Sequence, residues 1–215
     1  MKAKIIETDT AFPETIIFKV KSEKKLKFLP GQFASIKALS KNRAYSICSN
    51  PEDNFLEFCI KGTGEISRHL TNLKVGDEIE LEGPYGNFIF KNSKKKNIIF
   101  VSTGSGIAPI KSLINQAIKD KSKKILLYFG VKKRENLYYE EHFKSLEKEN
   151  KNFRFIPVFS REGKKRHVLD VIKEDIKDFN DIESYICGVP IMVKEVKEFF
   201  LEKGINESDI LTEQY

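Results

Sequence analysis

The chain has 215 residues, 40% of them hydrophobic and 32% charged, and this balance excludes an intrinsically disordered protein. No apolar run approaches the roughly 20 residues that cross a bilayer, and Glu7 comes too early for a secretory signal, so we expect a cytoplasmic protein without membrane insertion. Three cysteines without a C-x-x-C pair argue against a disulfide framework or a metal site. The net charge of +7 favours anionic partners, but the scattered lysines form no stripe interleaved with aromatics, so no nucleic acid is expected.

Residues 1–92 are expected to form one domain built from short strands. Turn signals such as Pro30-Gly31 and Gly83-Pro84 separate segments that are rich in β-branched and aromatic residues. The clearest strands are expected at 15–20, 32–36, 44–47, 55–60 and 78–81, and a single helix at 66–73. Many short strands with one helix predict a small antiparallel β-barrel.

Residues 98–215 follow a polar connector and show a different rhythm, in which apolar strands alternate with amphipathic helices. Strands are expected at 98–101, 125–129, 153–159, 184–187 and 209–212, and helices at 108–119, 140–149, 168–175 and 191–203. This alternation predicts a doubly wound α/β domain with a parallel sheet that is covered on both faces. Such sheets bind ligands beyond the carboxyl ends of their strands.

A glycine-containing turn lies where the first strand of this second domain becomes its first helix. Gly104 and Gly106 let the backbone turn tightly and approach a ligand, and the following helix start offers unpaired N–H groups. Together they can cradle a pyrophosphate. The third glycine of G-x-G-x-x-G is absent, and an ordinary strand–helix turn remains an alternative.

The first domain carries two segments with similar chemistry. Arg43, Tyr45 and Ser46 supply a phosphate-binding fork, a flat ring for stacking and a hydroxyl, and Arg43, Tyr45 and Ile47 share one strand face if alternation holds. Ser67 lies at the start of the single helix, where it can cap the helix or bind phosphate. A plain edge strand and a plain capped helix are the alternatives.

In order along nearly the whole chain, these motifs resemble those of the ferredoxin–NADP reductase superfamily. The similar segments are Arg43-Ala44-Tyr45-Ser46, Gly64-Glu65-Ile66-Ser67, Val75-Gly76-Asp77, Gly83-Pro84-Tyr85-Gly86-Asn87-Phe88, Thr103-Gly104-Ser105-Gly106-Ile107-Ala108-Pro109, Cys187-Gly188-Val189-Pro190-Ile191-Met192 and Glu213-Gln214-Tyr215. The resemblance implies an N-terminal antiparallel six-stranded Greek-key β-barrel with one helix, followed by the α/β domain.

The resemblance also implies roles for individual residues. FAD, rather than FMN, would be held by Arg43, Ala44, Tyr45, Ser46, Ile60, Lys61, Gly64, Glu65, Ile66 and Ser67. The nicotinamide dinucleotide would be held by Thr103, Gly104, Gly106, Gly188, Ser160, Arg161 and Lys165. The last three follow the third strand of the parallel sheet and suit the ribose 2′-phosphate, which favours NADPH over NADH.

Four residues would act at the site of hydride transfer. Ser46 would hydrogen-bond near flavin N5, Cys187 and Glu213 would orient the nicotinamide, and Tyr215 would cover one flavin face. Judged without the resemblance, Cys187 is a small core residue, Glu213 a solvated acid and Tyr215 a frayed tail.

The expected function is therefore transfer of electrons between NADPH and a one-electron carrier such as ferredoxin or flavodoxin. One alternative is an NAD(P)H–flavin reductase that uses free flavin as its substrate. Another is the reductase component of an oxygenase-type electron-transfer chain. A non-catalytic flavin-binding subunit or redox sensor is a further alternative, against which the joint presence of Cys187, Glu213 and Tyr215 counts.

Overall fold

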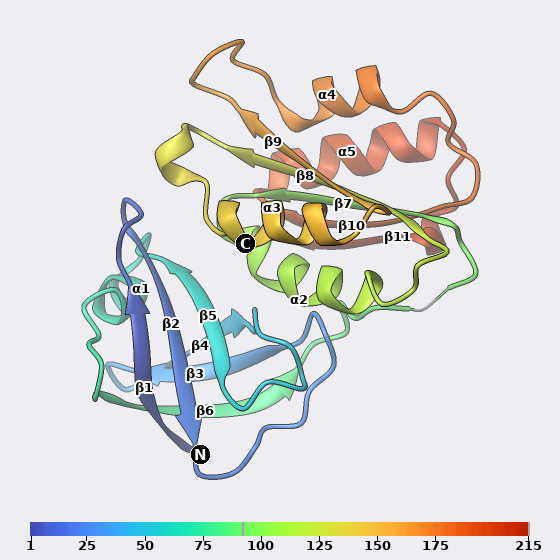
Figure 1. Cartoon of the computed structure of the whole chain (residues 1–215). Helices are drawn as coiled ribbons and strands as arrows, with labels where there is room; N and C mark the ends of the chain where they lie inside the picture. The colour runs from blue at the N-terminus through green and yellow to red at the C-terminus, as the bar shows by residue number, and fades with distance from the viewer. Residues whose placement is uncertain (92, 215) are drawn as a thin grey trace.

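The computed structural model describes residues 1–91 and 93–214, and within them the strands form two separate sheets (Figure 1). The first sheet orders its six strands β4-β3-β6-β1-β2-β5, and every pairing is antiparallel. Its elements are β1 (Lys2–Asp9), β2 (Thr15–Ser22), β3 (Phe33–Ala38), β4 (Lys41–Ser46), β5 (Leu56–Lys61), α1 (Glu65–Leu70) and β6 (Glu78–Tyr85).

The two edge strands of this sheet meet and close it into a barrel. Cys48, just after β4, donates its backbone N–H to the carbonyl of Glu57 in β5 over 2.8 Å. The interior is filled by alternate strand residues such as Ile16, Phe18 and Phe58, which are almost completely buried. The expected six-stranded Greek-key barrel with one helix is confirmed, because strands adjacent in the barrel include the non-consecutive pairs β2–β5, β3–β6 and β1–β6.

The second sheet is parallel throughout and has the strand order β11-β10-β7-β8-β9. Its elements are β7 (Asn97–Thr103), η1 (Gly104–Gly106), α2 (Ile107–Ala117), β8 (Lys124–Val131), η2 (Arg134–Asn136), α3 (Glu140–Glu149), β9 (Phe153–Phe159), α4 (Val168–Asp175), β10 (Ile182–Gly188), α5 (Pro190–Glu202), η3 (Glu207–Asp209) and β11 (Ile210–Gln214). The expected doubly wound domain is confirmed.

Helices cover both faces of the parallel sheet. Residues of α2 and α3 pack with Phe100, Leu127 and Phe129 on one face, and residues of α4 and α5 pack with Val101 and Tyr128 on the other. In Figure 1, α2 lies between the parallel sheet and the barrel. Consecutive side chains of one strand therefore pack into two different hydrophobic cores, one on each face of the sheet. This explains the near-continuous apolar runs in the sequence.

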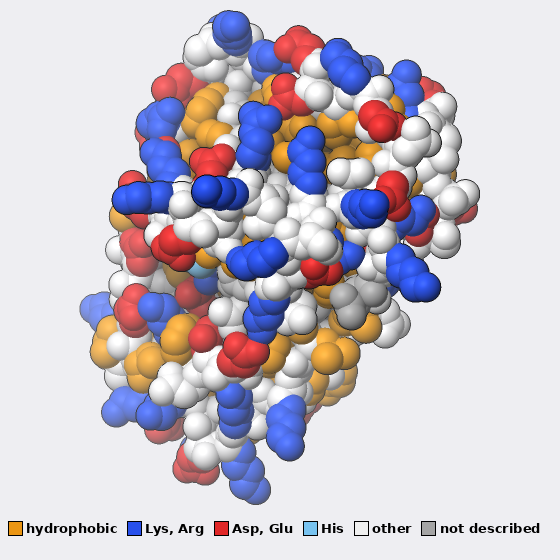
Figure 2. Space-filling view, turned by 45° about the vertical axis from the view of Figure 1, so that its right-hand side comes forward, with side chains coloured by type: hydrophobic (Ala, Val, Ile, Leu, Met, Phe, Trp, Pro, Cys, Tyr) orange, Lys and Arg blue, Asp and Glu red, His pale blue; other side chains and the backbone are white. Residues whose placement is uncertain are grey.

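The surface carries its charge in a dispersed form. On the face shown in Figure 2, lysine and arginine side chains are spread over both domains with acidic side chains among them. Within residues 1–91 and 93–214, no helix combines the length and apolar character needed to cross a bilayer.

Candidate functional site

The end of β4 passes from an exposed edge into the interior. Arg43 and Ala44 are exposed, Tyr45 is half-buried, and Ser46 is 5% exposed. Tyr45 packs against the barrel core. Cys48 instead belongs to a hydrophobic core cluster formed mainly by residues of the second domain. The expected alternation is thus present, but both faces become buried after Tyr45 because a second domain covers the outer one.

The hydroxyl of Tyr45 is buried and makes no well-formed hydrogen bond to the described residues. Burial raises the pKa of Tyr45, and the nearby charge of Arg43 and hydroxyl of Ser67 offset that rise only in part. A buried hydroxyl without a partner costs free energy unless a ligand pairs with it. The position is therefore suited to a polar group of a bound molecule.

The start of α1 lies beside β4. The Ser67 hydroxyl accepts from the Gly64 N–H over 3.0 Å, and Glu65 pairs with Lys41 of β4 over 3.4 Å. Ile66 is buried and anchors the helix to the barrel core. Gly64 has open space where a Cβ would stand, with only the Ser67 Oγ within 4 Å. The fold thus brings together the two flavin-type motifs predicted from the sequence.

The strand β5 connects this region to the second domain. Ile60 is buried in the barrel core and Lys61 is half-buried at the strand end. The strand contacts η1, which contains Gly104 and Gly106 of the predicted pyrophosphate turn. The flavin-type strand and the glycine turn are consequently neighbours in space.

The glycine turn packs tightly against the loop after β10. A Cβ on Gly106 would lie 2.4 Å from the carbonyl oxygen of Cys187, and one on Gly188 would lie 2.2 Å from the Thr103 Oγ1. The Thr103 Oγ1 accepts the backbone N–H of Val189 over 3.1 Å. In contrast, Gly104 has a φ of +55° and no atom within 4 Å of its Cβ position. The turn is thus packed tightly against the loop after β10, whereas at Gly104 it has free space beside it.

This contact lies at the topological switch point of the sheet. β7 continues towards β8 on one side, while β10 returns to pair with β7 on the other. Ser102, Cys187 and Glu213 stand at corresponding register positions on β7, β10 and β11. Cys187 is fully buried, and Glu213 is half-buried. Tyr215 lies outside the described residues.

A basic loop follows β9 at the same edge of the sheet. Ser160 and Arg161 donate their backbone N–H groups to the carbonyls of Val131 and Lys132, over 3.0 and 2.9 Å, which fixes the loop beside the end of β8. Arg161 and Lys165 are exposed. Because β9 is two strands from β7, the basic loop and the glycine turn are separated by about 10 Å along the edge.

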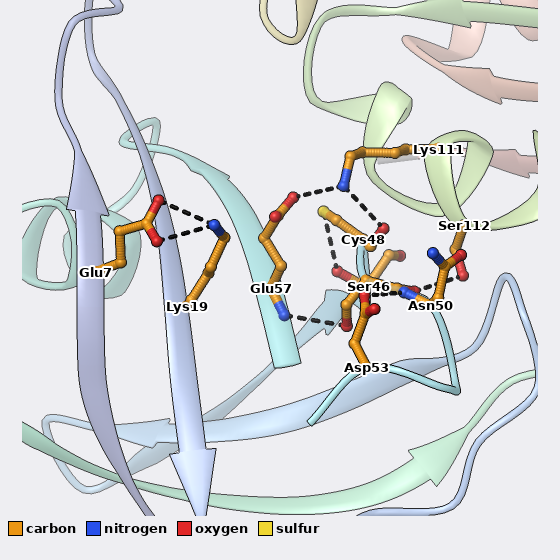
Figure 3. Close-up of polar contacts among 10 residues, drawn as sticks. Glu7, Lys19, Ser46, Cys48, Asn50, Asp53, Glu57, Lys111 and Ser112 are labelled. Carbon is orange, nitrogen blue, oxygen red and sulfur yellow. Dashed lines mark hydrogen bonds and ion pairs between the residues drawn. The ribbon is translucent and has the colours of Figure 1, made fainter. Parts of the chain in front are cut away.

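The polar contacts between the two domains were not predicted from the sequence. Lys111 of α2 pairs with Glu57 of β5 over 2.9 Å, and Ser112 donates to the carbonyl of Ser49 over 2.9 Å (Figure 3). A lysine in a helix and a glutamate in a strand match no motif. In the folded protein Lys111 is only 7% exposed and Glu57 only 5% exposed. This burial distinguishes them from ordinary surface residues, and it is visible only in the structure.

Each half of the chain matches a known family of protein domains. Residues 2–90 match the oxidoreductase FAD-binding domain, and residues 100–198 match the oxidoreductase NAD-binding domain. Both matches agree with the architecture, since the first covers the barrel and the second covers most of the parallel sheet.

Individual relatives point in the same direction. A probable flavin reductase of Aliivibrio fischeri is 30% identical over 197 residues, covering 86% of this chain and 84% of the relative. The ferredoxin–NAD(P)(+) reductase component of the naphthalene 1,2-dioxygenase system of Pseudomonas putida is 26% identical over 225 residues, covering all of this chain and 69% of the relative. Three longer relatives, that component among them, are spanned over 57 to 69% of their own length.

A solved structure shows the same two-domain arrangement. Ferredoxin–NADP+ reductase from Plasmodium falciparum superposes with a TM-score of 0.86 at 26% identity, covering all of this chain and 95% of that one. The FAD- and NAD-binding domain matches, the order of the motifs and the shared fold lead to one conclusion. The chain belongs to the ferredoxin–NADP reductase superfamily of flavoprotein oxidoreductases.

Proposed function

We propose that this protein transfers electrons between NADPH and a one-electron carrier of the ferredoxin or flavodoxin type, through bound FAD. Residues 1–92 would form the flavin domain and residues 98–215 the nucleotide domain. One observation carries most of the weight: the closed contact between the glycine turn and the Cys187–Gly188 loop lies directly beside β5 of the barrel. This geometry supports a nucleotide held across the switch point with its reactive end facing the barrel.

The flavin-side residues fit FAD. The buried hydroxyl of Tyr45 makes no well-formed hydrogen bond to the described residues, which is the expected state of a group that pairs with a ligand. Arg43 and Ser67 supply a cation and a hydroxyl for the phosphates, with Glu65 and Ile66 contributing backbone groups. Ile60 and Lys61 would contact the flavin through their backbone, beside Ala44 and Gly64. The match to an FAD-binding domain supports FAD over FMN.

Each protein group would then position a reactant. FAD, when bound, accepts a hydride from the nicotinamide and releases electrons one at a time. Ser46 would hydrogen-bond near flavin N5, while Cys187 and Glu213 would hold the nicotinamide against that position. Thr103, Gly104, Gly106 and Gly188 would hold the pyrophosphate. Tyr215 would cover the remaining flavin face. Most of the rate enhancement attributed to the protein would come from alignment.

The basic loop after β9 supports NADPH as the substrate. Arg161 and Lys165 are exposed cations, and Ser160 adds a hydroxyl, so together they suit a dianionic 2′-phosphate. Their separation of about 10 Å from the glycine turn matches one adenosine ribose between the two sites. Because NADPH is a cytoplasmic metabolite, we also infer a cytoplasmic location.

The direct experiment is a visible spectrum of the purified protein under anaerobic conditions. Flavin bands that bleach on addition of NADPH and return on addition of oxidised ferredoxin would support the proposed function. Bound flavin that neither NADPH nor NADH bleaches would refute it.

A second candidate is a reductase that uses free flavin as its substrate. It is favoured by one observation, the 30% identity to a probable flavin reductase of which the chain covers 84%. Protein that purifies without flavin, and oxidises NADPH only when FMN or FAD is supplied, would select this candidate. In a reductase component of an oxygenase electron-transfer chain, NAD(P)H would instead bleach the flavin, and only a dedicated carrier protein would reoxidise it.

A further inference from the structure

A buried ion pair joins the two domains. The Nζ of Lys111, in α2, lies 2.9 Å from the Oε1 of Glu57, in β5, and the two side chains are only 9% and 7% exposed. Burying two charges costs several kcal/mol of desolvation free energy per ion, and apolar residues of similar volume would stabilise the fold about as well. Stability alone therefore does not account for charged residues at this position.

The lysine makes further directional contacts around the same point. Its Nζ also lies 3.4 Å from the carbonyl oxygen of Cys48 and 4.9 Å from the ring centre of Tyr139. The next residue of α2, Ser112, donates its hydroxyl to the carbonyl of Ser49 over 2.9 Å. As Figure 3 shows, two consecutive residues of one helix hold two consecutive carbonyls of the barrel, and the ion pair holds the adjacent strand.

The segments joined here are those that carry the two halves of the candidate site. α2 begins directly after the glycine turn at Gly104–Gly106. The carbonyls of Cys48 and Ser49 belong to the segment that follows Ser46, and Glu57 shares β5 with Ile60 and Lys61. A shift of α2 against this segment would change the distance between the nucleotide and flavin positions directly.

We infer that the Lys111–Glu57 pair is a positioning device that fixes the nicotinamide against the flavin for hydride transfer. This inference rests on the proposed function. In this role the pair would act through α2 and β5 and not by direct contact with either reactant. Its three-sided contact restricts rotation as well as separation of the domains, which an apolar contact would not do because dispersion has little directionality.

The test replaces the pair as a unit, because a single substitution would leave one charge buried without a partner. The double variant Glu57→Leu/Lys111→Met keeps the volume and removes both charges. We expect its rate of flavin reduction by NADPH, in anaerobic single-turnover stopped-flow, to fall by about 10- to 100-fold, since a misplacement of 1 Å can cost about 100-fold. The dissociation constants of FAD and NADPH should change by less than about threefold, and the long-wavelength charge-transfer absorbance between nicotinamide and flavin should weaken.

The chain offers a matched control. Lys119, just beyond α2, pairs with Glu52 of the barrel over 2.6 Å, so it joins the same two domains, but its side chain is 49% exposed and that of Glu52 is 75% exposed. Exposed pairs contribute little, so Lys119→Met should leave the reduction rate within about twofold of the wild type. A reduction rate in the double variant equal to that of this control would overturn the inference. So would a slower rate explained entirely by weaker binding of FAD or NADPH.

A second readout separates this inference from the proposed function. Amide hydrogen exchange in residues 46–50 and 107–117 should be faster in the double variant than in Lys119→Met if the pair holds these segments together. If NADPH and NADH both fail to bleach the wild-type flavin, the proposed function fails by that result alone. The exchange comparison still decides the positioning role: equal exchange in the two variants would overturn it.

Discussion

Tyr45 has a buried hydroxyl that makes no well-formed hydrogen bond to the described residues, although the Ser67 hydroxyl lies nearby. Its ring packs against the barrel core, so the residue contributes to folding in addition to its proposed role in the flavin site. These two roles can be separated, because the ring is needed for packing and the hydroxyl is not. A buried hydroxyl that no protein group satisfies stabilises nothing until a ligand arrives.

The variant Tyr45→Phe should therefore weaken FAD binding without weakening the fold. We expect the dissociation constant of FAD to rise about 5- to 10-fold, which corresponds to the loss of one hydrogen bond of about 1–1.4 kcal/mol. The melting temperature of the flavin-free protein should stay the same or rise slightly. Flavin fluorescence titration and thermal denaturation measure the two quantities. Unchanged FAD affinity in a destabilised protein would contradict the assignment of Tyr45 to the flavin site.

Arg161 should set the preference between the two nicotinamide cofactors. Its exposed guanidinium lies on a loop fixed by backbone hydrogen bonds, so it is available to a phosphate without rearrangement of the chain. Arg161→Ala should raise the KM for NADPH about 10- to 100-fold, the effect of losing one charge-assisted hydrogen bond, and change the KM for NADH by less than about twofold. Lys177→Ala, at an exposed lysine beyond the other end of α4, is the matched control. Equal losses with both cofactors would remove Arg161 from the 2′-phosphate site.

Among the secondary-structure elements, η1 and the end of β10 fit together tightly. Formation of the proposed nucleotide site depends on this fit. Gly106 has no room for a side chain, because a Cβ would meet the backbone of Cys187 at 2.4 Å and of Gly188 at 2.7 Å. Backbone atoms of β10 cannot yield as a flexible side chain can. The cost of a methyl group here is therefore a displacement of β10 from α2.

Gly106→Ala should destabilise the protein by about 2–4 kcal/mol, the range for overpacking with backbone shifts. Gly104→Ala is the control for stability, since that Cβ would meet no atom within 4 Å and the cost comes only from the positive φ of +55°, about 1 kcal/mol. Urea denaturation of the two variants gives both values. A smaller loss for Gly106→Ala than for Gly104→Ala would contradict the tight packing of the switch point.

The sequence predicted the elements of the second domain more closely than those of the first. The helix expected at 140–149 coincides with α3, and that expected at 191–203 is shifted by one residue because Pro190 occupies the first helical turn. The first strand, Lys2–Asp9, was not among the clearest strands, since charged residues interrupt it and a bulge between Ile5 and Glu7 breaks its alternation. β6 extends to Tyr85, beyond the expected end at Leu81, through a segment that sequence rules treat as a turn.

Motifs located the candidate site because they encode local backbone conformation, as at Gly104 and Gly188. The contact between the domains was not predictable in the same way. Lys111 and Glu57 are 54 positions apart and become neighbours only when both domains are folded. No local preference of either residue differs from that of a solvated lysine or glutamate, so only their burial reveals them.

At the scale of the whole molecule, the interface between the domains has a pH dependence of its own. His142 lines a cleft of about 590 Å³ between the barrel and α3. Burial, reinforced by the charge of Lys111, lowers the pKa of His142 to about 4, against the weaker opposing effects of Glu57 and Glu149. The unfolded chain therefore binds a proton between pH 6.5 and pH 4 that the folded protein does not bind, and stability is lost as the pH falls through this range.

The free energy of unfolding should accordingly be lower at pH 5 than at pH 7.5, with His142 contributing about 1–2 kcal/mol after allowance for its partial exposure. His142→Gln should reduce that difference, whereas His69→Gln, at an exposed position near the end of α1, should leave it unchanged. Urea denaturation at the two pH values measures the effect. An identical pH dependence in wild type and His142→Gln would mean that His142 is protonated in the folded protein at pH 5.

We propose that the two domains together align NADPH with bound flavin, and single-turnover kinetics can test this alignment. Purified protein loaded with FAD is mixed anaerobically with NADPH in a stopped-flow spectrophotometer, and the flavin absorbance is followed. We predict a single-turnover bleaching whose rate saturates with NADPH, and which NADH reproduces only at much higher concentration. Flavin that binds but stays oxidised with both nucleotides would contradict the assignment of the switch point as a hydride-transfer site.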